Sequence, residues 1–253
     1  RRGHGELALV RGPGQLDAVL RSGRTAVVIA LEGGTALRDG DTLRELVDLG
    51  VSMVGLTWTE SSPYADSSAE PRAGDAGGLT QAGRELVALA NDLGVMLDVS
   101  HMSDRATEQT IAASRAPVLA SHSNARTLVD TPRNLSDALA SQIGGKGGLV
   151  GVMFHGPFLA SGRPATRADA VAHIQHFVAL LGAEHVGIGS DWDGVIQSPA
   201  GLERASMMEP LRADLGSAGL SPEALRAVQG GSFLRFWRKV DAARAPAPPP
   251  TDR

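Results

Sequence analysis

Short apolar runs alternate with amphipathic stretches along most of the chain. The runs are nearly continuous in apolar or small residues, which is typical of strands buried on both faces of a parallel sheet. They are Thr25–Gly33, Val51–Trp58, Gly94–His101, Ala116–Ser123, Gly147–Phe154 and His185–Trp192. Strand–helix–strand repetition implies parallel pairing through right-handed crossovers. The pattern therefore predicts an α/β fold built on a parallel sheet.

Helix boundaries are marked between these runs. The segment Leu79–Leu93 carries apolar residues with a 3.6-residue period. Thr80 is placed to cap this helix, and Gly94 is placed to end it. Thr166, with Asp169 three residues later, resembles a capping box at the start of another helix. These signals support the alternation of strands and helices.

The number of strands limits the architecture. The chain has 253 residues, of which 42% are hydrophobic, and this suits one large domain such as an α/β barrel. Six strand-like runs are visible, whereas a closed parallel barrel needs eight. Either the sheet is open and doubly wound, or two strands lie upstream of Arg1. Residues 1–12 show no regular pattern, and we expect them to be irregular.

Charge and cysteine content exclude several functions. The net charge is −4, so no basic field exists to attract nucleic acid or an anionic membrane surface. No apolar run approaches the roughly 18 residues of a membrane-spanning helix, so we expect no membrane span. The chain has no cysteine. A metal site must therefore use His, Asp and Glu, and a cysteine nucleophile is excluded.

Polar side chains gather at the carboxyl ends of the predicted strands. They are Glu32, Trp58, His101, His122, Asp191 and Asp193. In parallel α/β folds this edge forms the ligand site, so we expect these side chains to converge. One Glu, two His and one Asp without Cys predict an oxygen and nitrogen site for zinc or a similar divalent ion.

Each of these residues taken alone also has a structural interpretation. A buried Glu is commonly ion-paired, a strand-end His is commonly a hydrogen-bonded core residue, and the two aspartates could form a turn. His173 and His176 lie three apart on a predicted helix, and we expect them on a solvated face. His4 and Glu6 have the spacing of two ligands but lie in the irregular start. The joint occurrence at strand ends favours the metal site.

Other catalytic patterns are absent from the sequence. It has no G-x-S-x-G elbow of an α/β-hydrolase serine and no G-x-x-x-x-G-K-[ST] phosphate loop. Its glycine pairs lack the spacing of the dinucleotide fingerprint.

Motifs spread over roughly Gly14–Val240 resemble the renal (membrane) dipeptidase family of zinc peptidases, in its bacterial form. They occur in the family's order with compatible spacing. The matching stretches are ALEGG at 30–34, GLTWTESSPYAD at 55–66, GGLTQAGRELV at 77–87, LDVSHMS at 97–103, SHSNAR at 121–126, TPRNLSD at 131–137 and GIGSDWDGV at 187–195.

The resemblance implies a distorted (β/α)8 TIM-like barrel of the metal-dependent hydrolase type that binds two zinc ions. About six of the eight βα units of such a barrel are visible in this chain. Glu32 matches the carboxylate that bridges both ions, and His101 and His122 match the two histidines on the second ion. Asp191 matches the aspartate that deprotonates the attacking water, and Arg133 matches the arginine that binds the substrate carboxylate. A planar guanidinium suits such bidentate binding.

The chain departs from the family pattern in three places. In the family, the H-x-D ligands of the first ion lie on an earlier strand. We expect residues upstream of Arg1 to supply these ligands together with two further strands. Alternatively, a partner chain covers the exposed edge of the sheet. Trp58 stands where animal members have a histidine, and its indole offers one donor. His155 stands where relatives often have tyrosine. We expect Trp58, His155 and Asn124 to contact substrate.

The resemblance implies an enzyme, a zinc-dependent dipeptidase that hydrolyses small dipeptides by a metal-bound hydroxide. Two alternatives remain: an amidohydrolase acting on another small amide, ester or lactone, and a metal-poor, non-catalytic binding or scaffold relative. We expect the incomplete barrel to occupy residues 1–241 and a Pro/Ala-rich tail, residues 242–253, to be disordered. We also expect a cytoplasmic bacterial location, a small dipeptide as the partner, and a homodimer as one assembly to test.

Overall fold

A sheet of six parallel strands forms the centre of the molecule. The computed structural model describes residues 7–72 and 77–245. The strands follow the order β3-β4-β5-β6-β7-β8, so each connection leads to the neighbouring strand. Their bounds are β3 Ile29–Leu31, β4 Val51–Gly55, β5 Met96–Asp98, β6 Leu119–Ala120, β7 Leu149–Val152 and β8 Val186–Ile188. This succession is that of a (β/α) barrel, and it confirms the predicted fold class.

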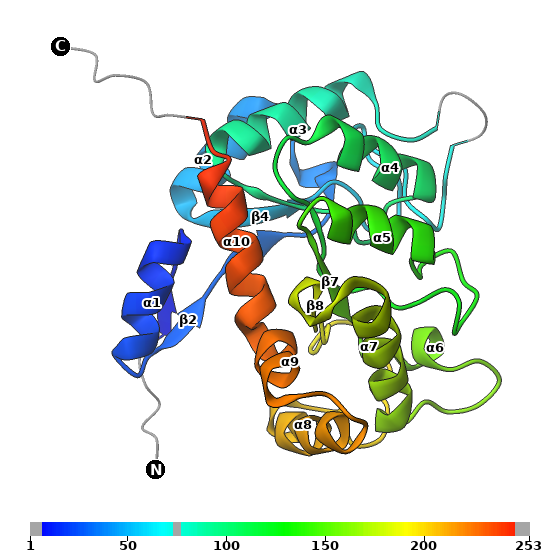
Figure 1. The fold of residues 1–253 in the computed structure, drawn as a ribbon. Helices are drawn as coiled ribbons and strands as arrows, with labels where there is room; N and C mark the ends of the chain where they lie inside the picture. Colours follow the sequence, from blue (N-terminus) through cyan, green and yellow to red (C-terminus); the bar gives the residue numbers. More distant parts are fainter. Residues whose placement is uncertain (1–6, 73–76, 246–253) are drawn as a thin grey trace.

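Helices cover the outer side of this sheet. Figure 1 shows α3, α4, α5 and α7 following one another in an arc around the strands, and each of these helices contacts the next. The helices are α1 Pro13–Arg21, α2 Gly40–Leu49, α3 Gln81–Leu93, α4 Asp104–Ala113, α5 Asp137–Gly145, α6 Gly156–Leu159, α7 Arg167–Leu181, α8 Met208–Ser217, α9 Pro222–Arg226 and α10 Ser232–Ala242.

The main core lies between strands and helices. Val54 on β4 and Leu97 on β5 are buried together with Leu86 on α3, Ile143 on α5 and Phe177 on α7. Burying one such side chain stabilises the fold by about 1.5–3 kcal/mol. The continuous apolar runs from Val51 onward are thus explained, because strands β4 to β8 are largely buried, whereas β3 at the sheet edge is not.

Three predicted helix boundaries are confirmed. The Thr80 hydroxyl accepts a hydrogen bond from the Gly83 backbone N–H, and α3 begins at the following residue. Gly94 ends α3 with a φ of 72°, a left-handed conformation that glycine adopts without a Cβ clash. Thr166 and Asp169 form both bonds of the predicted capping box before α7.

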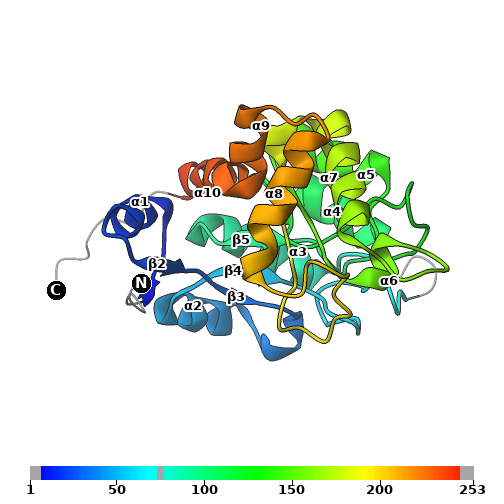
Figure 2. The same ribbon diagram turned by 90° about the horizontal axis from the view of Figure 1, so that it is seen from below.

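The predicted strand Thr25–Gly33 is wrong in its extent. The structure divides it at Val28 into β2, Thr25–Val27, and β3, and β2 pairs in parallel with β1, Leu7–Leu9. Part of the segment expected to be irregular is therefore a strand. β1 was missed because three residues are too few to show a period. The unit β1–α1–β2 lies at one end of the molecule beside α10 (Figure 2).

The sheet has two edge strands within residues 7–72 and 77–245. There β3 pairs with β4 alone and β8 with β7 alone, and the Ile29 side chain on β3 is 38% exposed. In the same residues no helix is long and apolar enough to cross a membrane. The candidate ligands His4 and Glu6, and residues 246–253 of the expected tail, lie outside the described part of the chain.

The solvated face predicted for α7 is wrong for His173. Its side chain is 1% exposed, since α7 packs against both α5 and α8. The Ala125 backbone N–H donates to its Nδ1 at 3.0 Å, and its Nε2 lies 3.2 Å from the Leu159 carbonyl oxygen. His176 is partly buried and contacts Asp137 Oδ1 at 2.8 Å.

Candidate metal centre

The carboxyl ends of the strands border one cavity of about 530 Å³. Glu32 directly follows β3, His101 lies beyond β5, and His122 lies beyond β6. Because these strands are parallel, their three loops leave the sheet at the same edge. Glu32 and His101 line the cavity, and His122 lies directly beside them.

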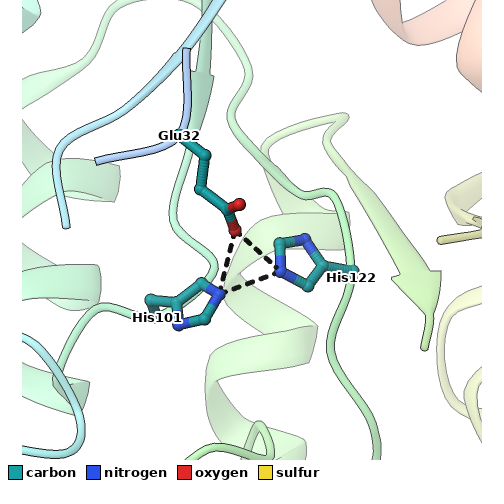
Figure 3. A group of neighbouring side chains, drawn as sticks. All are labelled: Glu32, His101 and His122. Atoms are coloured by element: carbon teal, nitrogen blue, oxygen red, sulfur yellow. Dashed lines mark hydrogen bonds and ion pairs between the residues drawn. The ribbon is translucent and has the colours of Figure 1, made fainter. Parts of the chain in front are cut away.

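The three predicted ligands point at one another (Figure 3). Glu32 Oε1 lies 3.0 Å from His101 Nε2 and 3.2 Å from His122 Nε2. The two Nε2 atoms are 3.0 Å apart. Segments separated by many residues thus bring one carboxylate oxygen and two imidazole nitrogens into a compact triangle.

Unusual backbone conformations occur at the same edge. Among the described non-glycine residues, positive φ values occur at His101 (68°), Asp191 (62°) and Asp193 (64°). This left-handed region costs residues with a Cβ about 1–3 kcal/mol, and such residues concentrate at functional sites. Two of the three were singled out from the sequence as strand-end polar residues facing the predicted site, and the third, His101, was a predicted ligand.

The electrostatic environment favours the ligand forms of these groups. The hydrogen bond with His101, the largest contribution, holds the pKa of Glu32 well below its usual range. Burial lowers the pKa of His101, although its bond to Glu32 opposes that shift. A carboxylate beside a neutral imidazole presents lone pairs, which a divalent ion requires.

A buried hydrogen-bond network of Ser121 and Asp98 holds the ring of His122. Ser121 Oγ lies 2.7 Å from His122 Nδ1 and also bonds to Asp98 Oδ2. Asp98 Oδ1 accepts the backbone N–H groups of Ser100 and Ser121, each at 2.9 Å. Sequence reasoning missed Asp98 and Ser121. The available signal was an acidic residue within an otherwise apolar buried strand.

Arg133 reaches the cavity wall from the loop before α5. Its Nη1 donates to Ser123 Oγ and its Nη2 to the His122 carbonyl oxygen, each at 3.0 Å. Its buried Nε–H has no hydrogen-bond partner among the residues that the structure describes. Burial lowers the pKa of Arg133 to about 10, so the guanidinium still carries its charge at neutral pH. A fixed cation in the cavity wall suits an anionic ligand group.

Three other predicted residues line the same cavity. Asp191, Trp58 and His155 all contribute to its wall, and the Trp58 side chain is 54% exposed. His155 Nδ1 accepts the Gln197 backbone N–H at 3.0 Å, and its ring packs edge-on against Phe158. His155 is thus placed as a wall residue and lies outside the ligand triangle.

Asn124 is placed differently from these residues. It is fully buried, its Oδ1 accepts the Met153 backbone N–H at 3.0 Å, and its Nδ2 donates to the Phe158 carbonyl at 3.2 Å. It is not among the residues that line the cavity. Its amide groups tie together the loops that carry the wall.

The triangle fits a divalent metal ion. Two imidazoles and a carboxylate are common zinc ligands, and atoms bound at about 2.0–2.2 Å around a tetrahedral ion lie roughly 3.3–3.6 Å apart. The observed separations of 3.0–3.2 Å are only slightly shorter. Glu32, His101 and His122 would hold such an ion.

Comparison with known proteins identifies the family of the chain. The model of the membrane dipeptidase family (peptidase family M19) matches residues 1–250. Dipeptidase 3 of Rattus norvegicus is 35% identical over 232 residues, which are 90% of this chain and 48% of that protein. The chain spans about half the length of the curated relatives it matches.

Solved structures share the fold. The probable dipeptidase PvdM from Pseudomonas aeruginosa superposes with a TM-score of 0.88 at 28% identity, covering 95% of this chain and 75% of that one. A metallopeptidase from Rhodobacter sphaeroides, bound to a phosphinate mimic of the dipeptide L-Ala-D-Ala, gives 0.85 at 28% identity, covering 94% and 70%. The strand-end ligands, the parallel sheet and the family match lead to one conclusion: this chain belongs to the membrane dipeptidase family, peptidase family M19.

Proposed function

We propose that this chain acts in a metal-dependent dipeptidase that hydrolyses the peptide bond of small dipeptides. One observation carries the proposal. The ligand atoms of Glu32, His101 and His122 converge beside a cavity that also presents Arg133 and Asp191. A metal site, a cation for a carboxylate and a carboxylate for proton transfer are the groups that dipeptide hydrolysis requires.

Zinc is the ion we propose, and Glu32, His101 and His122 would hold it. The oxygen ligand in the triangle is Glu32 Oε1, and Oε2 takes no part in those contacts. A bound zinc ion supplies Lewis-acid polarisation of the carbonyl and lowers the pKa of water. The remaining chemistry falls to side chains of this chain.

Arg133 and Asp191 divide that remaining work. Arg133 binds the C-terminal carboxylate of the dipeptide and thereby sets which amide lies over the ligand triangle. Asp191 accepts the proton of the attacking water and passes it to the leaving amine. Trp58 and His155 form walls that restrict the cavity to short substrates. The dipeptide mimic bound by the Rhodobacter sphaeroides enzyme supports a substrate with a D-residue on the C-terminal side.

Hydrolysis by the full chain tests the proposal. The protein is stripped with a chelator, reloaded with zinc, and assayed for alanine release from L-Ala-D-Ala and L-Ala-L-Ala. We expect release only in the reloaded protein and none from His122→Ala. Ser232→Ala, which removes a buried hydroxyl bonded to the Ala183 carbonyl on the far side of the fold, controls for lost stability. A zinc-loaded chain that releases no alanine contradicts the proposal.

Hydrolysis of another small amide is a second candidate. Much of the cavity wall is apolar, with Phe158, Val195 and Ile196 facing it beside Trp58. Such a wall accepts an acyl group as readily as an amino-acid side chain. Comparing dipeptides with N-acyl amino acids of the same C-terminal residue separates the two, because both keep the carboxylate that Arg133 would bind.

A further inference from the structure

His122 Nδ1, the ring nitrogen outside the ligand triangle, is held by a hydrogen-bond network of Ser121 and Asp98. His122 Nδ1 lies 2.7 Å from Ser121 Oγ, and Ser121 Oγ in turn bonds to Asp98 Oδ2. Asp98 is 6% exposed, and two backbone N–H groups fix its other oxygen. The last member of this hydrogen-bond network, Asp98, is therefore a rigid, buried acceptor.

The hydrogen atoms in the network of His122, Ser121 and Asp98 can be assigned from the donor and acceptor chemistry of the three side chains. A carboxylate only accepts hydrogen bonds, so the single Ser121 hydroxyl hydrogen must point to Asp98. Ser121 Oγ then offers only lone pairs to His122, and Nδ1 has to donate. The opposite assignment would leave Asp98 and Ser121 as two acceptors in contact without a hydrogen between them.

We infer that Ser121 and Asp98 are positioning residues, which lock His122 in the tautomer that carries its hydrogen on Nδ1. Its Nε2 lone pair is then directed at Glu32 Oε1 and His101 Nε2, the other two atoms of the ligand triangle. The inference rests on the proposed metal site for its purpose. Its structural content is the hydrogen on Nδ1, which follows from the contacts of Ser121 with His122 and Asp98 and is therefore expected with or without a bound metal.

The backbone makes the ring position as well defined as its tautomer. The His122 backbone N–H donates to Ser100 Oγ at 3.1 Å, and the His122 carbonyl accepts from Arg133 Nη2 at 3.0 Å. Both peptide groups flanking the side chain are therefore held. An imidazole that needs neither to rotate nor to move its hydrogen before binding loses less free energy on metal capture.

Ser121 is the better residue to vary. Burial lowers the pKa of Arg133 and the charge of Asp98 opposes that shift, so a change at Asp98 would also alter Arg133. Ser121→Ala removes the hydroxyl and leaves both charges in place. Ser121→Thr restores a hydroxyl at the same position and serves as the rescue.

Two histidines of the same chain provide references for the tautomer. His185 Nδ1 lies 2.7 Å from the Gly148 carbonyl oxygen, so it must donate and report the Nδ1–H form. His173 Nδ1 accepts the Ala125 backbone N–H and reports the Nε2–H form. Both lie away from the ligand triangle, so their signals should not respond to a change at Ser121.

The test combines nitrogen NMR of the metal-free full chain with zinc binding. In 15N-histidine-labelled protein we expect the His122 ring signals, assigned with His122→Gln, to match the pattern of His185. Ser121→Ala should move them toward a mixture of tautomers, and Ser121→Thr should restore them. Zinc affinity should fall roughly 10–100-fold in Ser121→Ala and change less than about 2-fold in Ser232→Ala.

The outcomes separate this inference from the proposed function. An Nε2–H signal for His122 in the unaltered chain overturns it, and so does a Ser121→Ala variant with an unchanged tautomer and unchanged zinc affinity. Failure of the proposed function appears elsewhere, as a zinc-loaded chain without dipeptide hydrolysis. The tautomer measurement needs neither zinc nor substrate. It therefore tests the network of Asp98, Ser121 and His122 whether or not the protein hydrolyses dipeptides.

Discussion

At the scale of single residues, the cavity wall combines fixed positions with unused chemistry. The Arg133 guanidinium is held by Ser123 Oγ and the His122 carbonyl, yet within the described part of the chain its Nε–H has no hydrogen-bond partner. A buried donor without a partner costs about 1–3 kcal/mol. Unsatisfied buried groups of this kind occur at functional sites, and Arg133 also lines the cavity, so it is the residue to examine for carboxylate recognition.

Replacing Arg133 by lysine should distinguish substrates by their C-terminus. Lysine keeps the charge and loses the planar fork. We expect kcat/KM for a dipeptide to fall roughly 10–100-fold, the equivalent of a lost charge-assisted hydrogen bond of about 1.5–3 kcal/mol. The C-terminally amidated dipeptide should lose little, as steady-state kinetics would show. Equal losses on both substrates, at unchanged zinc content, would assign Arg133 to the scaffold.

Asp191→Asn should reduce turnover without releasing the metal. Asp191 lines the cavity and is not part of the triangle formed by Glu32, His101 and His122. The amide cannot accept the proton of the attacking water, and loss of a general base lowers kcat by about 10²-fold or more. Metal analysis beside kinetics checks this. Loss of zinc from the variant would mark Asp191 as a ligand.

At the scale of elements, the close approach of strand ends sets the position of the ligands. Gly189, just after β8, lies so close to the segment following β6 that a Cβ there would overlap the Ser121 carbonyl oxygen and approach His122 Cα to 2.9 Å. Neighbouring backbone cannot yield as a flexible side chain can. Strand spacing here therefore depends on the absence of a side chain.

Gly189→Ala should disturb the site through the backbone. Overpacking of this kind costs about 1–3 kcal/mol, and we expect a matching fall in the free energy of unfolding together with weaker zinc binding. Gly187→Ala on β8 is the control, since its Cβ would meet only the Leu149 side chain, at 3.6 Å. Urea denaturation and zinc titration measure both effects. Equal behaviour of the two variants would contradict the packing argument.

At the scale of the whole molecule, His173 joins three segments in the core. From α7 it accepts the Ala125 N–H of the loop after β6, and it contacts the Leu159 carbonyl at the end of α6. Burial lowers the pKa of His173 from 6.5 to about 4. A protonated His173 would also lose its acceptor for Ala125, so the fold requires the neutral ring.

The stability of the fold should therefore decline in mild acid. The folded-state pKa of His173 lies below its unfolded value, so the unfolded chain takes up this proton first as pH falls. The contribution is complete above pH 6.5 and is lost toward pH 4, up to about 3 kcal/mol. Urea denaturation between pH 6.5 and pH 4 should show this fall in the free energy of unfolding for the unaltered chain and for His176→Asn. In His173→Asn the free energy of unfolding should depend less on pH.

Local sequence signals determined the elements that local physics controls. The apolar runs predicted the strands of the central sheet, because strands buried on both faces need continuous apolar composition. Thr80, Gly94 and the Thr166–Asp169 pair predicted helix ends correctly, because capping depends on residues within one turn. β1 and the break at Val28 escaped, because three-residue strands carry too short a pattern and their pairing is set by distant segments.

The site divides in the same way. Its residue types and strand-end positions were written in the sequence, since parallel strands place their carboxyl ends at one edge. Only the tertiary structure decided that Glu32 Oε1 lies 3.0 Å from His101 Nε2, that His173 is enclosed, and that Asn124 is buried behind the cavity-lining residues instead of lining the cavity itself. It also decided that Asp98 supports His122. Such relations depend on side chains many residues apart, and their burial and distances exist only after the sheet and its helices have packed.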